Sequence, residues 1–421
     1  MKRAIALLLC AVTLLSLAAC GGEEKDPNKL IGGVIVDDYN YITLTDKLTQ
    51  AQIDAFPIKR SDMTVAEMRQ LCVDFFRFSK GALWMPMDTV SIPINYAGTT
   101  MDKMTKGTPY GGLPYVGNGG CSSVYRMMDY YNEEKGVLDI KRASAKSAGL
   151  FGNHCSGAAY WGWARVINSA NYEFCAEMTH SRGFLRVGPY TYNDRMPEFS
   201  THFQTTTICA DNGADVMFQS YAQLQLGDGL VYYTTGGHVI MVSSEPHVEY
   251  LEDGSIDPNK SYMYILEQGQ SWKSYTSKNG DSFQAKESID KKVSFLYLFD
   301  HNYLPFTFAE FLGTDPVEET QCTSSLSGES VTLSQIFSST IQSNYAISDA
   351  YVLISNDKGV IKKVMVKAPA VHTMELSLRS QGSNVDTWGE PDLSKGEFTV
   401  EIQVQLGTGE RLTVYSGKLA K

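Results

Sequence analysis

The pattern of apolar and polar positions predicts a chain that mixes helices with strands. Thr64 and Glu67 have the spacing of a helix capping box. Apolar residues then recur at helical intervals, at Met68, Leu71, Phe75 and Phe78. We therefore predict a helix with one buried stripe, which begins after Thr64 and ends at Gly81.

Strand patterns dominate the region that follows. Residues 230–233 and 238–242 are apolar runs joined by the turn Thr234-Thr235-Gly236-Gly237, which predicts a hairpin. Further β runs cover residues 262–266 and 293–299. Residues 179–218 instead combine short β-prone pieces with Gly, Pro and Asn, which predicts long loops around a site.

Beyond about Gly313 the alternation becomes regular, as in an all-β domain. Residues 400–406 and 411–415 are joined by a turn that contains two glycines, and residues 351–355 and 360–366 form a second predicted hairpin. We predict an immunoglobulin-like β-sandwich over residues 320–421. This segment carries no cluster of acids or cysteines, so we expect it to bind a ligand or act as a spacer.

The first residues have the pattern of an exported lipoprotein. Lys2 and Arg3 precede an apolar stretch, residues 4–17, which is shorter than the ~20 residues needed to cross a bilayer. The sequence Leu17-Ala18-Ala19-Cys20 resembles the bacterial lipobox, in which the cysteine is lipidated. The resemblance implies a signal peptide over residues 1–19, a lipid on Cys20, and a tether with an N-terminal extension over residues 20–60. We expect the lipid to anchor the protein to the extracytoplasmic face of a bacterial cell membrane.

Composition limits the partners. The net charge of -11 and the isoelectric point near 5.2 argue against nucleic acid, because such surfaces need clustered Lys and Arg. The 421 residues, 43% of them hydrophobic, are enough for two domains. The sequence does not specify an oligomeric state.

The cysteines beyond Cys20 are widely scattered. They are Cys72, Cys121, Cys155, Cys175, Cys209 and Cys322. They lack the paired short spacings of a zinc site and the density of a disulfide scaffold. We therefore expect no metal and no cofactor, and we expect most of these cysteines to be small buried side chains, although an exported protein can also hold one disulfide.

Cys155 differs from the other cysteines in its setting. The sequence Asn153-His154-Cys155-Ser156-Gly157 runs directly into the apolar stretch 158–167, which places the cysteine on the first turn of a buried helix. The free N–H groups and the positive dipole end of a helix N-terminus stabilise a thiolate. Cys155 is therefore the candidate nucleophile.

A thiol nucleophile needs a base within hydrogen-bond reach. His154 adjoins Cys155, but adjacent residues on a helix do not face each other, so His154 is a poor base. His238 begins a predicted strand directly after Gly236-Gly237, where an imidazole can point into a cleft. We therefore select His238 as the candidate base.

Three motifs resemble the papain-like cell-wall hydrolases of the NlpC type and the related CHAP domains. They are Cys155-Ser156-Gly157 at a helix start, Gly227-Asp228 before a strand, and Gly237-His238-Val239 at the start of the next. Their order matches those families over roughly residues 107–270. The resemblance implies an α+β fold, with a papain-like domain and an antiparallel sheet over residues 61–313 that carries insertions. It also implies that Cys155 is the nucleophile and His238 the general base and later acid.

The resemblance also suggests further members of the site. CHAP-like domains place a glutamate at a strand end, and here the run 262–266 is followed by Glu267 and Gln268. Adjacent strand residues point to opposite faces, so only one of the two serves, and we prefer Glu267, with Gln268 as the alternative. Tyr110, in a Tyr-Gly-Gly loop, is a further candidate because NlpC-type enzymes have an aromatic-Gly-Gly loop before the nucleophile.

These residues predict a surface-anchored cysteine peptidase or amidase. The family resemblance and the expected location suggest that it cleaves amide or peptide bonds in peptidoglycan or another cell-envelope peptide. Two alternatives stay open: a binding lipoprotein that keeps the fold without catalysis, and an exported thiol acyltransferase of the transglutaminase kind, in which an amine replaces water.

Overall fold

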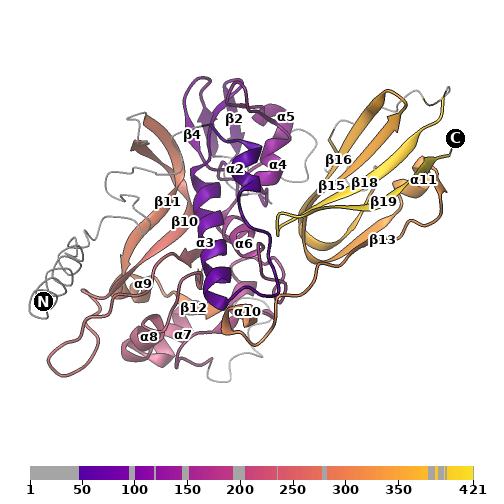
Figure 1. The fold of residues 1–421 in the computed structure, drawn as a ribbon. Coiled ribbons are helices and arrows are strands. Elements are labelled where there is room, and N and C mark those ends of the chain that lie inside the picture. The colour runs from indigo at the N-terminus through magenta and orange to yellow at the C-terminus, as the bar shows by residue number, and fades with distance from the viewer. Residues whose placement is uncertain are drawn as a thin grey trace, which may run out of the picture.

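The computed structural model describes residues 47–93, 100–117, 120–144, 151–192, 204–234, 236–276, 282–377, 385–386, 393 and 396–420. The predicted signal peptide, Cys20 and most of the predicted tether lie outside these residues. No helix within the described ranges is long and apolar enough to cross a membrane. Figure 1 shows a mixed α and β part that ends near α10 (Ala309–Leu312), followed by a part that consists of strands and the short helix α11 (Leu333–Ile336).

The first part is built on one ten-stranded sheet. In spatial order its strands are β5 (Tyr131–Asn132), β6 (Val137–Leu138), β1 (Leu83–Pro86), β4 (Tyr110–Gly111), β11 (Ser282–Ser294), β10 (Tyr262–Thr276), β9 (Gly237–Val242), β8 (Gly229–Tyr233), β12 (Leu304–Thr307) and β7 (Leu185–Arg186). A separate two-stranded sheet joins β2 (Val90–Pro93) to β3 (Met101–Met104).

Helix α3 (Val65–Gly81) confirms the first sequence prediction. Thr64 is its N-cap, and Thr64 and Glu67 form the reciprocal hydrogen bonds of a capping box. The predicted stripe is buried, at Met68, Leu71, Phe75 and Phe78. The helix therefore lies with this stripe against the protein, and Figure 1 shows it running along the middle of the first part.

Helix α6 (Cys155–Trp163) has no polar face, and all of its residues are buried. Its flanks pack against α3, β9 and β10. The Trp163 indole N–H donates to the Gly227 carbonyl at 2.7 Å, which ties the helix to the turn before β8. The helix that carries Cys155 is thus fixed on several sides by the first part of the chain.

The predicted hairpin of residues 230–233 and 238–242 is present as β8 and β9, which pair antiparallel. The prediction for the next strand was too short. β10 does not end at Leu266 but continues to Thr276, because β11 pairs with it through two register shifts, between Ile265 and Glu267 and between Gln268 and Lys273. Glu267 and Gln268 therefore lie inside a strand.

Two other predicted segments have different structures. The run 293–299 is not a strand beyond Ser294. Ser294 caps α9 (Phe295–Asp300) by accepting a hydrogen bond from Tyr297 N–H, and Phe295 and Leu298 are buried at helical spacing. The region 179–218, predicted as long loops, contains α7 (Thr205–Asn212) and most of α8 (Ala214–Tyr221), and a short 3-10 helix, η1 (Glu177–Thr179), ends at its first residue.

The predicted hairpins of the C-terminal part are present. They lie within β15 (Thr340–Asn356) and β16 (Gly359–Glu375), and within β18 (Thr399–Leu406) and β19 (Arg411–Leu419). The backbone pairing joins these strands in one sheet, in the order β14 (Ser330–Val331), β19, β18, β15, β16 and β17 (Val385–Asp386), and β13 (Cys322–Ser324) also pairs with β15. The C-terminal part is mostly β, as expected, with one short helix, but the pairing does not separate the strands into the two sheets of the predicted sandwich. The reason is that β15 changes partner, from β13 to β18, along its length.

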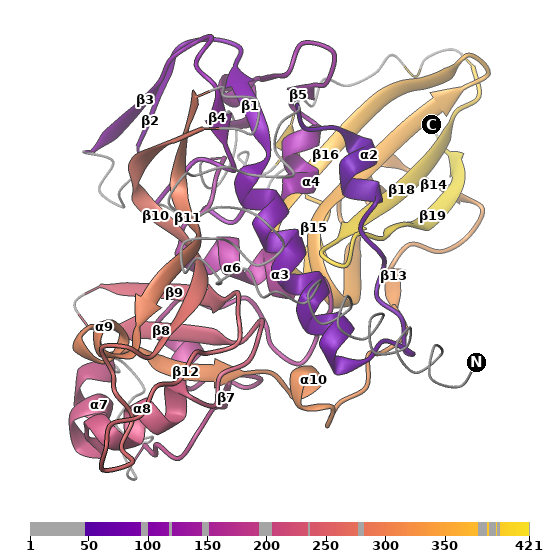
Figure 2. The ribbon, with the colours of Figure 1, turned by 60° about the vertical axis from the view of Figure 1, so that its left-hand side comes forward.

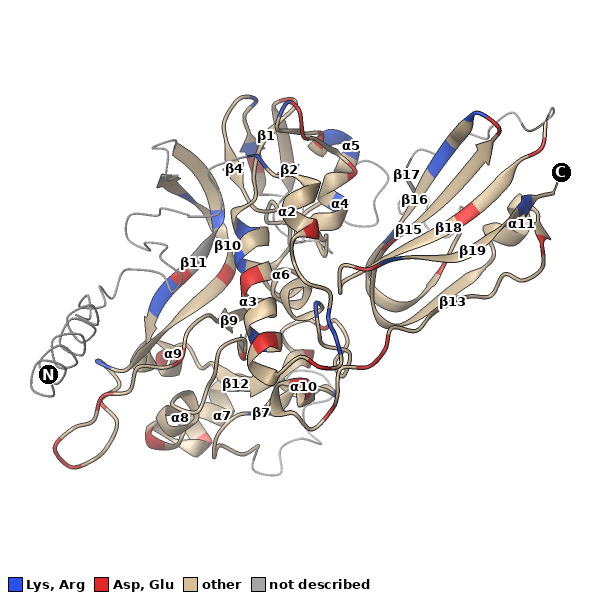
Figure 3. Ribbon diagram, viewed as in Figure 1, with Lys and Arg blue, Asp and Glu red and all other residues tan. Residues whose placement is uncertain are grey.

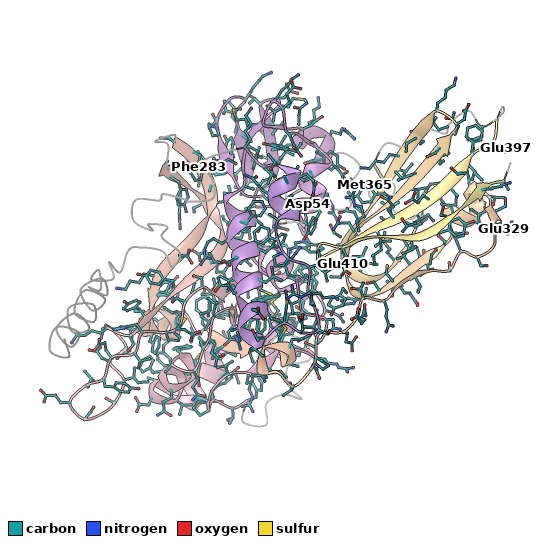
Figure 4. All side chains as sticks on the ribbon, viewed as in Figure 1. Asp54, Phe283, Glu329, Met365, Glu397 and Glu410 are labelled. Atoms are coloured by element: carbon teal, nitrogen blue, oxygen red, sulfur yellow. The ribbon has the colours of Figure 1, made fainter. Side chains whose placement is uncertain are left out.

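The two parts meet through a buried polar contact. Arg126, on α4 (Val124–Met128), donates from Nε to Asp349 Oδ1 at 2.7 Å and from Nη2 to the Ser348 carbonyl at 2.7 Å. The Tyr351 hydroxyl donates to Asp129 Oδ2 at 2.7 Å beside it. Figure 2 shows β15 and β16 passing alongside α4. Met365 of β16, labelled in Figure 4, packs in the same hydrophobic core as residues of the first part. The C-terminal part is therefore packed against the first part.

A second buried ion pair holds the first part together. Arg69 on α3 donates to Asp228 Oδ1 at 2.8 Å and also to the carbonyls of Leu226 and Phe311. We predict that Asp228→Asn lowers the free energy of unfolding by about 3–5 kcal/mol, because it leaves the buried guanidinium without its counter-charge. Urea denaturation of the purified protein measures this change.

The matched control is Asp62→Asn. Asp62 pairs with Arg60 at the same 2.8 Å, but its side chain is 75% exposed, so the expected change is about 0–1 kcal/mol. Equal effects of the two substitutions would contradict the assignment of Asp228 to a structural pair.

Candidate active site

Cys155 occupies the first position of α6, as its sequence setting predicts. His154 is the N-cap, and its Nδ1 accepts the Gly157 N–H at 3.4 Å. The Cys155 side chain is buried, with 6% of its surface exposed. Within the described ranges, the backbone N–H of Cys155 has no hydrogen-bond acceptor. That N–H is therefore available to an oxyanion.

His154 fixes the start of the helix. Its Nδ1 also accepts from the Ser156 hydroxyl at 2.9 Å, and its Nε2 donates to the Tyr172 hydroxyl at 2.8 Å. Its ring stacks on Phe174, with the ring centroids 5.3 Å apart. Both ring nitrogens of His154 thus have hydrogen-bond partners other than Cys155.

His238 and Glu267 lie on neighbouring strands of the sheet. Ile240 on β9 is opposite Glu267 on β10, so His238 and Glu267 are diagonal neighbours on one face. His238 Nε2–H donates to Glu267 Oε2 at 3.1 Å. Cys155 lies next to the same imidazole, and the two side chains shift each other's pKa. The structure therefore brings Cys155, His238 and Glu267 together in a chain of three.

The charges in this chain favour an ion pair. The pKa of Cys155 is lowered well below its usual value, first by the hydrogen bond from the Cys175 thiol and then by the neighbouring His154 and His238 side chains, although burial opposes the shift. Burial also acts to lower the pKa of His238, but its hydrogen bonds to Cys155 and Glu267 outweigh that effect and raise the pKa to about 10. Near neutral pH the site accordingly holds a thiolate beside an imidazolium.

Glu267 has two cationic neighbours in addition to His238. Lys291 Nζ lies 3.2 Å and Lys273 Nζ 3.9 Å from Glu267 Oε1. Figure 3 shows that both signs of charge lie on β10 and β11 in this region. The carboxylate that orients the imidazole is itself held in place by these cations.

Gln268, the alternative third residue, does not reach His238. Its side chain is buried on the opposite face of β10, where it accepts from Lys80 Nζ and donates to the Leu113 carbonyl at 3.0 Å. The reason is the two-residue period of a strand, which sends adjacent side chains to opposite faces. Glu267 is therefore the residue that orients His238.

Tyr110 is also placed differently from the prediction. Its hydroxyl accepts the Thr105 N–H at 3.0 Å, and its ring packs against Trp84 and Trp272, with centroids 5.3 Å and 5.0 Å away. These contacts belong to the β1, β4 and β10 region and do not include Cys155, His238 or Glu267.

Tyr115, from the same loop, is the aromatic residue that lies beside the nucleophile segment. Its backbone bridges to Asn153, and its hydroxyl accepts from Gln270 Nε2 at 3.2 Å. β4 takes Tyr110 into the sheet, so of the two tyrosines it is Tyr115 whose backbone lies beside Asn153, two residues before the nucleophile.

The Gly227-Asp228 motif has a structural role. Asp228 is buried and accepts from Arg69, from the Thr307 hydroxyl at 2.5 Å and from the Gln225 N–H at 2.8 Å. Through the Gly227 carbonyl, the same turn holds Trp163 of α6. The motif thus sets the position of the nucleophile helix relative to β8 and β9.

Cys175 is the member of the site that the sequence did not identify. We expected a buried apolar side chain, but its Sγ lies 3.6 Å from the Sγ of Cys155. Gly237 makes this approach feasible, because a Cβ at that position would come within 2.6 Å of the Cys175 Cβ. No sequence spacing relates Cys155 to Cys175, so this contact was not open to prediction.

Within the described part of the chain, no group of three or more His, Cys, Asp and Glu side chains is arranged to hold a metal ion. No protein-family model matches the chain, and comparisons with curated proteins and with solved structures give no match either. The chemistry of the site is therefore argued from its own geometry.

The ion pair predicts an unusual pH dependence of alkylation. Because the pKa of Cys155 is lowered, its rate of reaction with iodoacetamide should change less than about twofold between about pH 6 and pH 8. Cys322 is a control within the same chain, since burial raises its pKa to about 11 and its rate should rise about tenfold per pH unit. Mass spectrometry of the alkylated peptides measures both rates. A tenfold rise per pH unit at Cys155 would contradict the thiolate assignment.

Proposed function

We propose that the protein is a cysteine hydrolase of amide or peptide bonds, with a papain-like arrangement of helix and sheet. The observation that supports this proposal most directly is the grouping of three side chains: His238 is hydrogen-bonded to Glu267 at 3.1 Å, and Cys155 lies next to the same imidazole. A thiol nucleophile, a base within reach and a third group that orients the base are the parts that such enzymes need. Cys155 is buried, and the His238 and Glu267 side chains are only 18% and 12% exposed, so limited access of water strengthens their interaction.

The proposed reaction proceeds by acyl transfer. The Cys155 thiolate attacks the carbonyl carbon, and the Cys155 backbone N–H stabilises the oxyanion that forms. The His238 imidazolium gives its proton to the leaving amine as the carbon–nitrogen bond breaks, which leaves a thioester on Cys155. Neutral His238 then takes a proton from water as the water attacks the thioester. This step releases the acid and restores the thiolate beside the imidazolium.

Peptidoglycan, or another peptide of the cell envelope, is the proposed substrate. The lipobox-like start of the chain and the order of the three motifs support it. Both features describe a hydrolase tethered outside a bacterial membrane, where cross-linked peptides are the abundant amide substrate. No metal or cofactor is needed for this chemistry.

We predict that Cys155→Ala and His238→Ala each reduce release of peptidoglycan fragments by at least about 10³-fold. Glu267→Gln should reduce it by roughly 10²-fold, because an amide stabilises the imidazolium less than a carboxylate does. Chromatography of fragments released by purified residues 30–421 measures these effects. The substitution of His238 tests the base separately from the nucleophile.

The chain offers a matched control for the His–Glu pair. His247 Nε2 and Glu249 Oε1 lie 2.8 Å apart on the surface, and each side chain is 48% exposed. His247→Ala and Glu249→Gln should therefore leave the rate within about twofold of wild type.

If Cys155→Ala releases the same products as wild type, or if no fragment is released while the protein still binds peptidoglycan, the hydrolase proposal is wrong. Products that carry an added amine in place of water would instead identify an acyltransferase.

The anchor is tested independently of the chemistry. We predict that Cys20→Ala moves the protein from the membrane fraction to the soluble exported fraction, because the lipid would have no attachment point. Metabolic labelling with palmitate followed by fractionation measures this, with Cys322→Ala as the control. Retention of label and of membrane association in Cys20→Ala would contradict lipidation at this cysteine.

A further inference from the structure

The site contains two thiols in direct contact. Cys155 Sγ and Cys175 Sγ are 3.6 Å apart, and a disulfide bond is about 2.05 Å long, so closure needs about 1.5 Å of approach. Cys175 belongs to the irregular segment between α6 and η1. Bond formation can therefore use side-chain rotation and a small movement of that segment, without displacing a helix.

Among the described cysteines, no other pair is in hydrogen-bond contact. Cys72 contacts the Trp163 carbonyl and Cys209 the Tyr303 carbonyl, whereas Cys121 is buried and Cys322 lies in the C-terminal part. Cys155 and Cys175 are also more accessible than the other cysteines of the first part, at 6% and 8% exposed. A small oxidant would reach this pair before the more deeply buried thiols of the first part.

We propose that Cys155 and Cys175 form a reversible intramolecular disulfide when the protein meets hydrogen peroxide. The Cys155 thiolate attacks one peroxide oxygen and the O–O bond breaks, which gives the sulfenic acid of Cys155 and, with one proton, water. The Cys175 sulfur then attacks the sulfenic sulfur, and the hydroxyl leaves with the Cys175 proton as a second water. In total two thiols and one peroxide give one disulfide and two waters, and a dithiol reductant reverses the change.

The two thiols differ in pKa, and this difference decides which of them reacts with peroxide first. Hydrogen bonds lower the pKa of Cys155, whereas the pKa of Cys175 is raised well above its usual value, first by its hydrogen bond to Cys155. Cys155 therefore reacts with peroxide first, and Cys175 resolves the product. A resolving thiol this close prevents further oxidation of Cys155 to forms that thiols do not reduce.

The consequence for activity rests on the proposed function, but the disulfide does not. A Cys155 sulfur bonded to Cys175 has no lone thiolate with which to attack a carbonyl. The oxidised protein would accordingly be protected and inactive, and reduction would return the nucleophile.

The test treats purified protein with hydrogen peroxide and maps disulfide-linked peptides by mass spectrometry. Wild type should give one linked pair, the peptides of Cys155 and Cys175, together with loss of Cys155 alkylation that dithiothreitol restores. Cys175→Ser should give no linked pair. In that variant dimedone should trap the sulfenic acid of Cys155, and prolonged peroxide should cause loss of alkylation that dithiothreitol does not restore. Cys322→Ser is the control and should behave as wild type.

The proposal is overturned if wild type yields no Cys155–Cys175 linked peptide, or if dimedone labels Cys155 equally in wild type and in Cys175→Ser. It also fails if the linked peptides appear only between two molecules. If the intramolecular disulfide forms but reduced protein cleaves no peptidoglycan, the modification stands and the proposed hydrolase function fails. The two proposals are therefore judged by separate readouts.

Discussion

The packing of helix α6 is the constraint on which the rest of the structure depends. This helix has no polar face, so protein must cover it on every side. In the first part, α3 and the strands β9 and β10 pack against it. Gly157 allows the backbone of Gly120 to approach closely, because a Cβ on residue 157 would lie 2.8 Å from the Gly120 carbonyl oxygen. The N-terminus of α6 carries the candidate nucleophile, Cys155, which lies beside His238. Complete burial of the helix body therefore fixes the nucleophile in front of the sheet.

The C-terminal part completes this cover. Trp161 and Ala164, from the end of α6, pack in one cluster with Ala346 and Ala370 of the C-terminal sheet. The buried pair of Arg126 and Asp349 lies beside this cluster and satisfies charges that neither part could bury alone. Burial raises the pKa of Asp349 to about 6, against the effect of its ion pair with Arg126, which shows how strongly this interface excludes water. The C-terminal part is thus a structural component of the nucleophile's support, beyond the spacer role suggested by its sequence.

The site itself combines charge and burial. A thiolate and an imidazolium would each be costly to bury alone, but together with Glu267 they form a chain in which every charge has a partner. Cys175 adds a donor to the same thiolate and, being a thiol, introduces a second chemistry at 3.6 Å from the first. The same contact that stabilises the nucleophile therefore places a resolving partner next to it.

The sequence by itself determined the elements whose signals are local. The capping box of α3, the position of Cys155 at a helix start, the β8–β9 hairpin and the two C-terminal hairpins all depend on neighbouring residues, and each is present.

Elements that depend on distant partners were decided by the tertiary structure. β10 extends past Glu267 because β11 pairs with it, residues 295–300 are helical because their apolar side chains meet the core at helical spacing, and β15 joins the C-terminal strands in one sheet because it changes partner. The choice of Glu267 over Gln268, the position of Tyr110 away from Cys155, and the contact of Cys155 with Cys175 likewise depended on the tertiary structure. The spacing of apolar residues indicates whether a segment repeats as a strand or as a helix. It does not determine the strand register or the chain path that brings distant side chains together.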